Sequence, residues 1–392
     1  MTEAIGGVAV GDRPKAVHPN LLPVLGAAED LPTRSLRAHL RRLPEPTAVV
    51  EPPLIETDTA PGFSSVRRIT VDRGPIADMS VDPRDGLIYV ANQADNSVAV
   101  LDPATLSVVS TIAGTEEPFA IAAADGRAFV GTVTMSHDAV TVVDPSMGGE
   151  SVADHPLALS VRDLTVDPGG RYVFAARSGR HGADVAVVDT TDGRVTTMNL
   201  GTRPGAAAQA ITVSRDGARV YVITVDDLGG ELVAIDAAAR RVIGSLAFPS
   251  PLRDVAVSPD GTTVFVATCD LSFGGVVDVV DTRRMRVVDS VDVGGLITQV
   301  VVSAEGERLY VANGDRISVI CTLTHEIVDT VTVVEQPSCI AESADGKRLF
   351  IADYDGAVTI LKVASTTESL LAKMMTPDVI DIAMLELEAV GV

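Results

Sequence analysis

Two Arg-Asp pairs are the side chains of this sequence best suited to hold a ligand. Arg162-Asp163 and Arg253-Asp254 each stand near the start of a run of β-forming residues. An arginine can donate two parallel hydrogen bonds to a carboxylate or a phosphate, and an adjacent aspartate can orient it. The pairs therefore indicate a site for an anionic group, with solvated ion pairs inside one structural unit as the alternative.

His137 and His181 are further candidates, because two imidazole rings and a carboxylate can hold a transition metal. The chain has only six histidines and no His-x-x-x-His spacing, so we expect no metal and no cofactor. The sequence also contains no phosphate-binding loop, no dinucleotide-binding fingerprint and no Gly-x-Ser-x-Gly nucleophile motif. No motif in the chain therefore requires covalent chemistry.

The elements that must position these residues come from a sevenfold repeat. Short turns rich in Asp and Gly recur at intervals of 40 to 47 residues, and each is followed by an aromatic-aliphatic strand. The turns end at Gly86, Gly126, Gly170, Gly217, Gly261, Gly306 and Gly346. A repeat of this length with several short β runs is typical of a β-propeller. The sequence therefore predicts an all-β, seven-bladed propeller with four-stranded blades.

Propellers bind ligands where their innermost strands begin, at the mouth of the central channel, and this placement is carried over from the fold. Counting back from the repeated glycines, one column of residues at the mouth reads Asp78, Phe119, Asp163, Ala210, Asp254, Gln299 and Cys339. The column before it reads Ala77, Pro118, Arg162, Gln209, Arg253, Thr298 and Ser338. From these columns and the nearby loops we predict a ligand or partner site composed of Asp78, Arg162, Asp163, Gln209, Arg253, Asp254, Gln299, His137 and His181.

The chain outside the repeat forms two further segments. Residues 1–64 are rich in proline and predict an extended arm, in which residues 33–42 could form a short helix. Residues 65–363 form the propeller, and a strand at 66–71 is expected to complete the last blade and so close the ring. Residues 364–392 predict a helix and an apolar-acidic tail that packs on the propeller, with binding of a partner as the alternative.

Several of the predicted third strands end in aspartate. At the end of a strand, an aspartate can accept hydrogen bonds from the amides of the following turn. We therefore interpret as structural the residues Asp102, Asp144, Asp189, Asp236 and Asp281.

The composition argues against several classes of partner. The formal net charge of −22 disfavours nucleic acid. No stretch approaches about eighteen consecutive apolar residues, so we expect no membrane span. The three cysteines, Cys269, Cys321 and Cys339, are scattered and are expected to be reduced thiols. Because the first residues also lack the pattern of a secretory signal, we expect a monomeric cytoplasmic protein.

The segment Tyr89–Asp102, with the sequence YVANQADNSVAVLD, resembles the YVTN-type β-propeller repeat, and residues 257–261 and 309–313 echo it. The resemblance covers about residues 65–363 and extends to cytosolic propellers of mycobacteria and other actinobacteria that have no assigned reaction. It implies the fold and not an activity, because the related surface-layer, lactonase-like and quinoprotein-like propellers do not carry their functions in the repeat.

We interpret the chain as a non-enzymatic binding platform for a protein or a small polar ligand at the channel mouth. The alternative, which the resemblance suggests, is a lactonase-like hydrolase acting on a small anionic substrate. Its site would combine Asp163, Asp254, His137 and His181, with the two arginines holding the substrate. A quinoprotein-like cofactor site is disfavoured because the chain contains no tryptophan.

Overall fold

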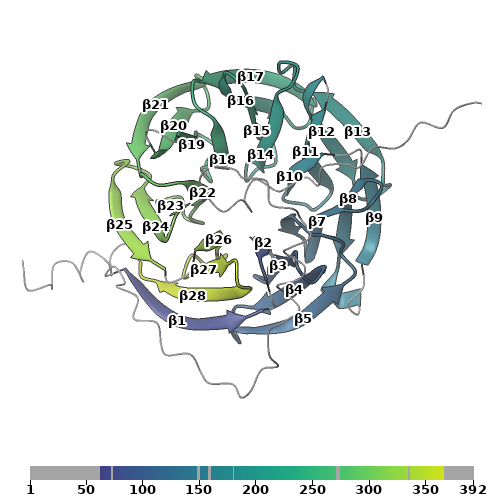
Figure 1. Cartoon of the computed structure of the whole chain (residues 1–392), viewed down its shortest axis with the longest axis vertical. Helices are drawn as coiled ribbons and strands as arrows, with labels where there is room; N and C mark the ends of the chain where they lie inside the picture. The colour runs from purple at the N-terminus through teal and green to yellow at the C-terminus, as the bar shows by residue number, and fades with distance from the viewer. Residues whose placement is uncertain are drawn as a thin grey trace, which may run out of the picture. The chain divides into compact units, whose positions relative to one another are not determined.

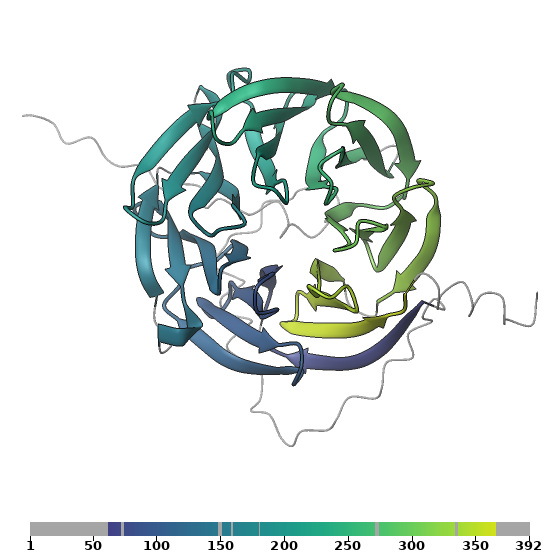
Figure 2. The same cartoon turned by 180° about the vertical axis from the view of Figure 1, so that it is seen from behind.

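The computed structural model describes residues 62–71, 74–147, 151–157, 160–179, 181–270, 274–333 and 336–365. All of these residues belong to one compact unit, Glu45–Val392. They form seven four-stranded antiparallel sheets that surround a common axis as the blades of a propeller (Figure 1, Figure 2). The prediction of an all-β, seven-bladed propeller is confirmed. The predicted arm helix at 33–42 lies outside the described residues, and so do the predicted C-terminal helix and tail, 364–392, beyond residue 365.

Each blade places its four strands in order from the axis to the rim. The innermost strands are β2 (Ile76–Val81), β6 (Ala120–Ala124), β10 (Val161–Val166), β14 (Ala207–Val213), β18 (Leu252–Val257), β22 (Ile297–Val302) and β26 (Pro337–Glu342). The second strands are β3 (Ile88–Asn92), β7 (Arg127–Val133), β11 (Tyr172–Gly179), β15 (Arg219–Asp226), β19 (Thr263–Asp270), β23 (Arg308–Asn313) and β27 (Arg348–Asp353).

The third strands are β4 (Ser97–Asp102), β8 (Asp138–Val143), β12 (Gly182–Asp189), β16 (Gly229–Asp236), β20 (Gly274–Asp281), β24 (Arg316–Cys321) and β28 (Ala357–Val363). The outer strands are β5 (Ser107–Ala113), β9 (Ser151–Leu157), β13 (Val195–Asn199), β17 (Arg241–Phe248), β21 (Arg286–Asp292), β25 (Ile327–Thr332) and, from the other end of the chain, β1 (Phe63–Thr70). A 3-10 helix, η3 (Pro145–Met147), follows β8. We number the blades from blade 1, which begins with β2, to blade 7, which begins with β26.

The hydrophobic core lies between neighbouring blades. Each second strand contributes one aromatic residue, which is at most 2% exposed: Tyr89, Phe129, Phe174, Tyr221, Phe265, Tyr310 and Phe350. Each of these rings packs against residues of the following blade, as Phe350 of blade 7 packs against Ile76 and Met79 of blade 1. Burying such a side chain stabilises the fold by about 2–3 kcal/mol, so the blades support one another and no blade has a core of its own.

The repeated glycines end the turn between the first and second strand of every blade. Their φ angles lie between 67° and 80°, a left-handed conformation that favours glycine. These turns gather at one end of the ring, which we call the lower end. The innermost strands begin at the opposite end, the upper end, where the second strands also meet the third strands.

The ring is closed by the N-terminal strand. β1 pairs antiparallel with β28 along its length, from Phe63 opposite Val363 to Thr70 opposite Ala357. Arg68 Nη2 lies 2.7 Å from Asp353 Oδ2 of the same blade, and Asp353 is 4% exposed. The predicted closure is confirmed, although the strand begins three residues earlier than the sequence pattern indicated.

The aspartates at the ends of the third strands have the structural role that the sequence predicted. Asp102, Asp144, Asp189, Asp236 and Asp281 each accept a hydrogen bond from a backbone amide two or three residues ahead. Each of them therefore holds the turn that leads to the outer part of its blade. Within the described ranges, no helix has the length and apolar character needed to cross a membrane.

Candidate functional site

A β-bulge recurs near the start of the innermost strands. In all seven blades except blade 2, the pairing between the first and second strand shifts by one residue at the same place. The bulged residues are Ala77, Arg162, Gln209, Arg253, Thr298 and Ser338. A bulge leaves one residue outside the ladder of hydrogen bonds and redirects its side chain. The second predicted column, which precedes the column at the mouth by one residue, therefore consists of bulged residues in these six blades.

Four of the bulged residues make a polar arc over consecutive blades. Arg162, Gln209, Arg253 and Thr298 come from blades 3, 4, 5 and 6, and all four are half-buried. The Nε atom of Arg253 is buried and has no hydrogen-bond partner among the described residues. A buried donor without a partner costs free energy, and an acceptor from a ligand would remove that cost.

The column at the mouth, which follows the bulged residues by one position, contains carboxylates that link neighbouring blades. Asp78, Asp163 and Asp254 each accept the amide of the following residue with one oxygen. The other oxygen accepts an amide of the next blade at 2.8–2.9 Å, donated by Ile121, Ile211 and Val300 respectively. Gln299 does the same with its Oε1, which accepts the Ile340 amide at 2.6 Å. These side chains therefore hold neighbouring blades in register.

Blade 2 departs from the predicted column. Ala120, and not Phe119, pairs opposite the second strand at the position equivalent to Asp78. The Phe119 ring lies against Gly131 of β7, where a Cβ atom would come within 2.6 Å of it. Blade 2 has no bulge at this place, and it has Ala120 where blade 1 has Asp78.

The three aspartates are within electrostatic reach of one another. Burial raises the pKa of Asp78 to about 8, of Asp254 to about 7 and of Asp163 to about 6. The charge of Asp163 raises the pKa of Asp78 and of Asp254 further, whereas the amides that they bind oppose these shifts. The axis therefore carries carboxyl groups that exchange protons near neutral pH.

The two histidines lie in hairpin turns of neighbouring blades at the upper end. His137, between β7 and β8, has its Nδ1 atom 2.8 Å from the Ser136 hydroxyl, and His181, between β11 and β12, is exposed. The part of the chain that the structure describes contains no group of three or more His, Cys, Asp or Glu residues placed to hold a metal ion.

Sequence reasoning missed Glu342, the last residue of β26. The other blades have an aliphatic residue at this place: Val81, Ala123, Val166, Val213, Val257 and Val302. Glu342 accepts hydrogen bonds from the Tyr310 hydroxyl, at 2.8 Å, and from the Ala304 amide, and burial raises its pKa. A carboxylate in an otherwise apolar column was the signal that could have identified it.

Glu342 borders a cavity of about 340 Å³ at the lower end between blades 6 and 7. The lining mixes three cationic side chains with Glu342 and three further carboxylates. Glu342 itself already has donors from blade 6 for both of its oxygens. The cavity therefore has side chains of both charges along its lining, and this lining does not select a ligand of either sign.

The geometry at the upper end suits recognition better than covalent chemistry. Both oxygens of each axial aspartate are engaged by backbone amides, which restricts their use as nucleophiles. The guanidinium and amide groups on the bulges can donate hydrogen bonds to an anionic or polar ligand. The arrangement can thus bind an acceptor-rich group at the end of the axis.

Comparison with known proteins supports the fold and identifies similar proteins. The chain is 39% identical to "Seven-bladed beta-propeller protein Rv1057" of Mycobacterium tuberculosis, over 69% of this chain and 78% of that protein. It is also 39% identical to a seven-bladed beta-propeller protein of Mycolicibacterium smegmatis, over 66% of this chain and 69% of that protein. No protein-family model matches the chain, so the YVTN-type assignment stays a prediction.

Among solved structures, the hydrazine synthase of Kuenenia stuttgartiensis contains a similar ring. The TM-score is 0.65 at 19% identity, over 76% of this chain and 97% of that chain. The TM-score supports a common fold, and identity at this level carries no inference about activity.

Proposed function

The chain belongs to the family of mycobacterial seven-bladed β-propeller proteins, and we propose that its ring is a non-enzymatic binding platform. The ligand site lies at the upper end, on the arc of bulged residues Arg162, Gln209, Arg253 and Thr298. The partner is a protein or a small polar molecule that presents a carboxylate, a phosphate or a similar acceptor to the arc.

The observation that carries this proposal is the buried Nε of Arg253, which has no hydrogen-bond partner in the part of the chain that the structure describes. Buried polar groups of native proteins are nearly always hydrogen-bonded, so an exception at a recurring bulge is a candidate contact for a ligand. Gln209 and Thr298 flank Arg253 on the adjacent blades and supply further polar groups. The inter-blade hydrogen bonds of Asp163 and Asp254 hold the strands that carry both arginines.

The proposal is tested with the double variant Arg162→Ala, Arg253→Ala. The control is Arg283→Ala, which removes an exposed arginine from the turn between β20 and β21. All three proteins are used for capture from a mycobacterial cytosolic lysate with quantitative mass spectrometry, and for thermal-shift titration with small carboxylates and phosphates. Wild type and the control should retain the same partner or show the same stabilisation, and the double variant should lose it. Equal behaviour of all three proteins would contradict the proposal.

A lactonase-like hydrolase is the second candidate, and one observation favours it. The raised pKa values of Asp163 and Asp254, about 6 and about 7, lie where a general acid or base is effective. A panel of lactones assayed with wild type, Asp163→Asn and the double arginine variant separates the two functions. Turnover that is lost in both variants would support the hydrolase, whereas ligand binding without turnover would support the platform.

A further inference from the structure

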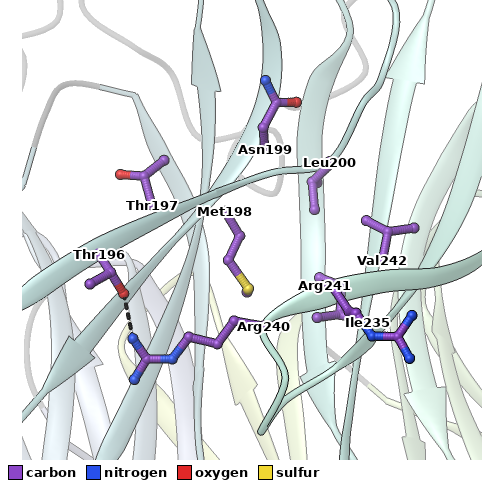
Figure 3. A pocket seen from close by; sticks show the side chains of 9 residues that line it. All are labelled: Thr196, Thr197, Met198, Asn199, Leu200, Ile235, Arg240, Arg241 and Val242. Atoms are coloured by element: carbon purple, nitrogen blue, oxygen red, sulfur yellow. Dashed lines mark hydrogen bonds between the residues drawn. The ribbon is translucent and has the colours of Figure 1, made fainter.

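A pocket of about 390 Å³ lies on the outer rim, between β13 of blade 3 and the last hairpin of blade 4 (Figure 3). Met198 and Leu200, both buried, supply apolar surface, and Thr196 and Thr197 supply hydroxyls. Arg240 and Arg241 belong to the turn between β16 and β17 and the start of β17, and in the view of Figure 3 Met198 extends between them. The volume is typical of a site for a small molecule.

The charge of this pocket is opposite to that of the whole chain. The protein has 53 acidic and 31 basic residues, yet none of the nine described residues that line the pocket carries a carboxylate. The cavity at Glu342, by comparison, contains carboxylates beside its cations. The rim pocket therefore concentrates positive charge without internal compensation.

Arg240 is fixed by uncharged partners. Its Nη1 donates a hydrogen bond of 2.7 Å to Thr196 Oγ1, and its guanidinium lies 5.4 Å from the centre of the Tyr172 ring. Arg171 contacts the same ring at 4.9 Å, but its charge is paired with Asp189 at 3.1 Å. Arg240 thus keeps its net charge and is already held in place, which lowers the entropy cost of binding an anion.

The same contact recurs between other blades with different residues. The turns before five of the outer strands each present a residue with positive φ, among them Arg240 (51°), Met285 (47°) and His325 (58°). Met285 of blade 5 packs near Gly244 of blade 4. His325 of blade 6 bonds to Asp289 of blade 5 at 2.7 Å, and this bond lowers the pKa of Asp289.

The positions that receive these contacts are equivalent in register. Thr196 pairs with Val187, Gly244 with Ala234 and Asp289 with Val279, each two residues before the aspartate that ends the third strand. Blade 5 therefore offers a carboxylate to the side chain of the next turn, His325, whereas blade 3 offers a hydroxyl to Arg240. No described residue that lines the rim pocket supplies a carboxylate to Arg240, so an external anion could take that place.

We propose that the rim pocket binds a small organic oxyanion, a phosphate or carboxylate attached to an apolar group. The oxyanion lies against Arg240 on the Thr196 side of the pocket, and the apolar group contacts Met198 and Leu200. This site is distinct from the arc at the upper end and does not depend on it.

The experiment is calorimetric titration of the full chain at low ionic strength, where screening of the arginines is weakest. The probes are phenyl phosphate, inorganic phosphate and benzoate, which separate the contributions of phosphate, carboxylate and apolar group. Two variants take their residues from the neighbouring blade: Thr196→Asp supplies the missing carboxylate, and Arg240→Met removes the cation. Arg283→Met is the matched control, and far-UV circular dichroism establishes that each variant is folded.

Phenyl phosphate or benzoate should bind wild type and the Arg283→Met control saturably and equally. The dissociation constant should rise at least tenfold in both Thr196→Asp and Arg240→Met, and inorganic phosphate should bind at least several-fold more weakly than phenyl phosphate. The double variant at Arg162 and Arg253 lacks the upper-end arginines and should keep saturable binding of the probes at the rim. Adding Thr196→Asp to it should raise the dissociation constant at least tenfold, which separates this site from the upper end. Absence of saturable binding by any probe, or undiminished binding by both rim variants, would overturn the proposal.

Discussion

The Asp254 carboxyl should make the protein less stable as the pH rises from about 5 to about 7. Burial raises the pKa of this group from 3.8 to about 7, and the nearby charge of Asp163 adds to the shift. Between these two values the folded protein holds a proton that the unfolded chain has released. The stabilisation is therefore present at low pH and is lost as the pH rises through the folded pKa.

One such proton changes the free energy of unfolding by about 1.4 kcal/mol per pH unit, which amounts to about 2 kcal/mol over this interval. Asp254→Asn removes the titration but retains an oxygen that can accept the Val300 amide. The free energy of unfolding of the variant, relative to wild type, should therefore rise by about 2 kcal/mol between about pH 5 and about pH 7. The absolute difference at one pH also contains the loss of one amide contact, so the change with pH is the informative quantity.

Urea unfolding at several pH values, followed by far-UV circular dichroism and tyrosine fluorescence, measures this change. Asp216→Asn is the control, because the hydroxyl of Ser214 and the amide of Ala218 lower the pKa of Asp216. That carboxylate is ionised in both states throughout the interval, so its variant should differ from wild type by a constant amount. Parallel pH profiles for Asp254→Asn and wild type would refute the reasoning, since they would mean that Asp254 is ionised in the folded protein.

Three further predictions concern the packing of the ring. Phe63→Ala removes a side chain that is 6% exposed and should cost about 3 kcal/mol in urea unfolding, whereas Val66→Ala in the same strand, at 42% exposure, should cost little. Gly131→Ala places a Cβ atom 2.6 Å from the Phe119 ring and should lower the melting temperature, and the added change Phe119→Leu should restore part of it; additive effects would contradict this contact. Tyr310→Phe leaves a Glu342 oxygen without its donor and should cost about 1–2 kcal/mol, whereas Tyr221→Phe removes a buried hydroxyl without a described partner and should cost nothing measurable.

The blade architecture could be predicted from the sequence because its signals are local. A turn that ends in glycine and a following aromatic-aliphatic strand are written within about ten residues, and they recur in every blade. The closing strand could be predicted for a related reason: the last blade lacked an outer strand, and the segment before the first blade supplied one. Strand-end aspartates such as Asp102 act on their own turns, so their role was also readable from sequence.

The candidate site could be predicted in position but not in detail. Counting from the glycines placed Arg162, Arg253 and their neighbouring aspartates at the upper end. It failed in blade 2, because the part of the turn that precedes the repeated glycine is one residue shorter there than in blade 3, so the count reaches Phe119 whereas the equivalent residue is Ala120. Binding by these residues stays a prediction.

The sequence by itself determined the repeat, its turns, the strand that closes the ring and the columns of residues at the channel mouth. Each of these features follows from a pattern that is local in sequence. Only the tertiary structure decided what those residues meet. One oxygen of Asp163 accepts an amide 48 residues away, and Arg253 Nε has no partner within the described ranges. Arg240 meets Thr196, whereas His325 meets Asp289 at the equivalent position. These contacts join one blade to another, and burial between blades sets the pKa values at the axis, so no single repeat contains the information.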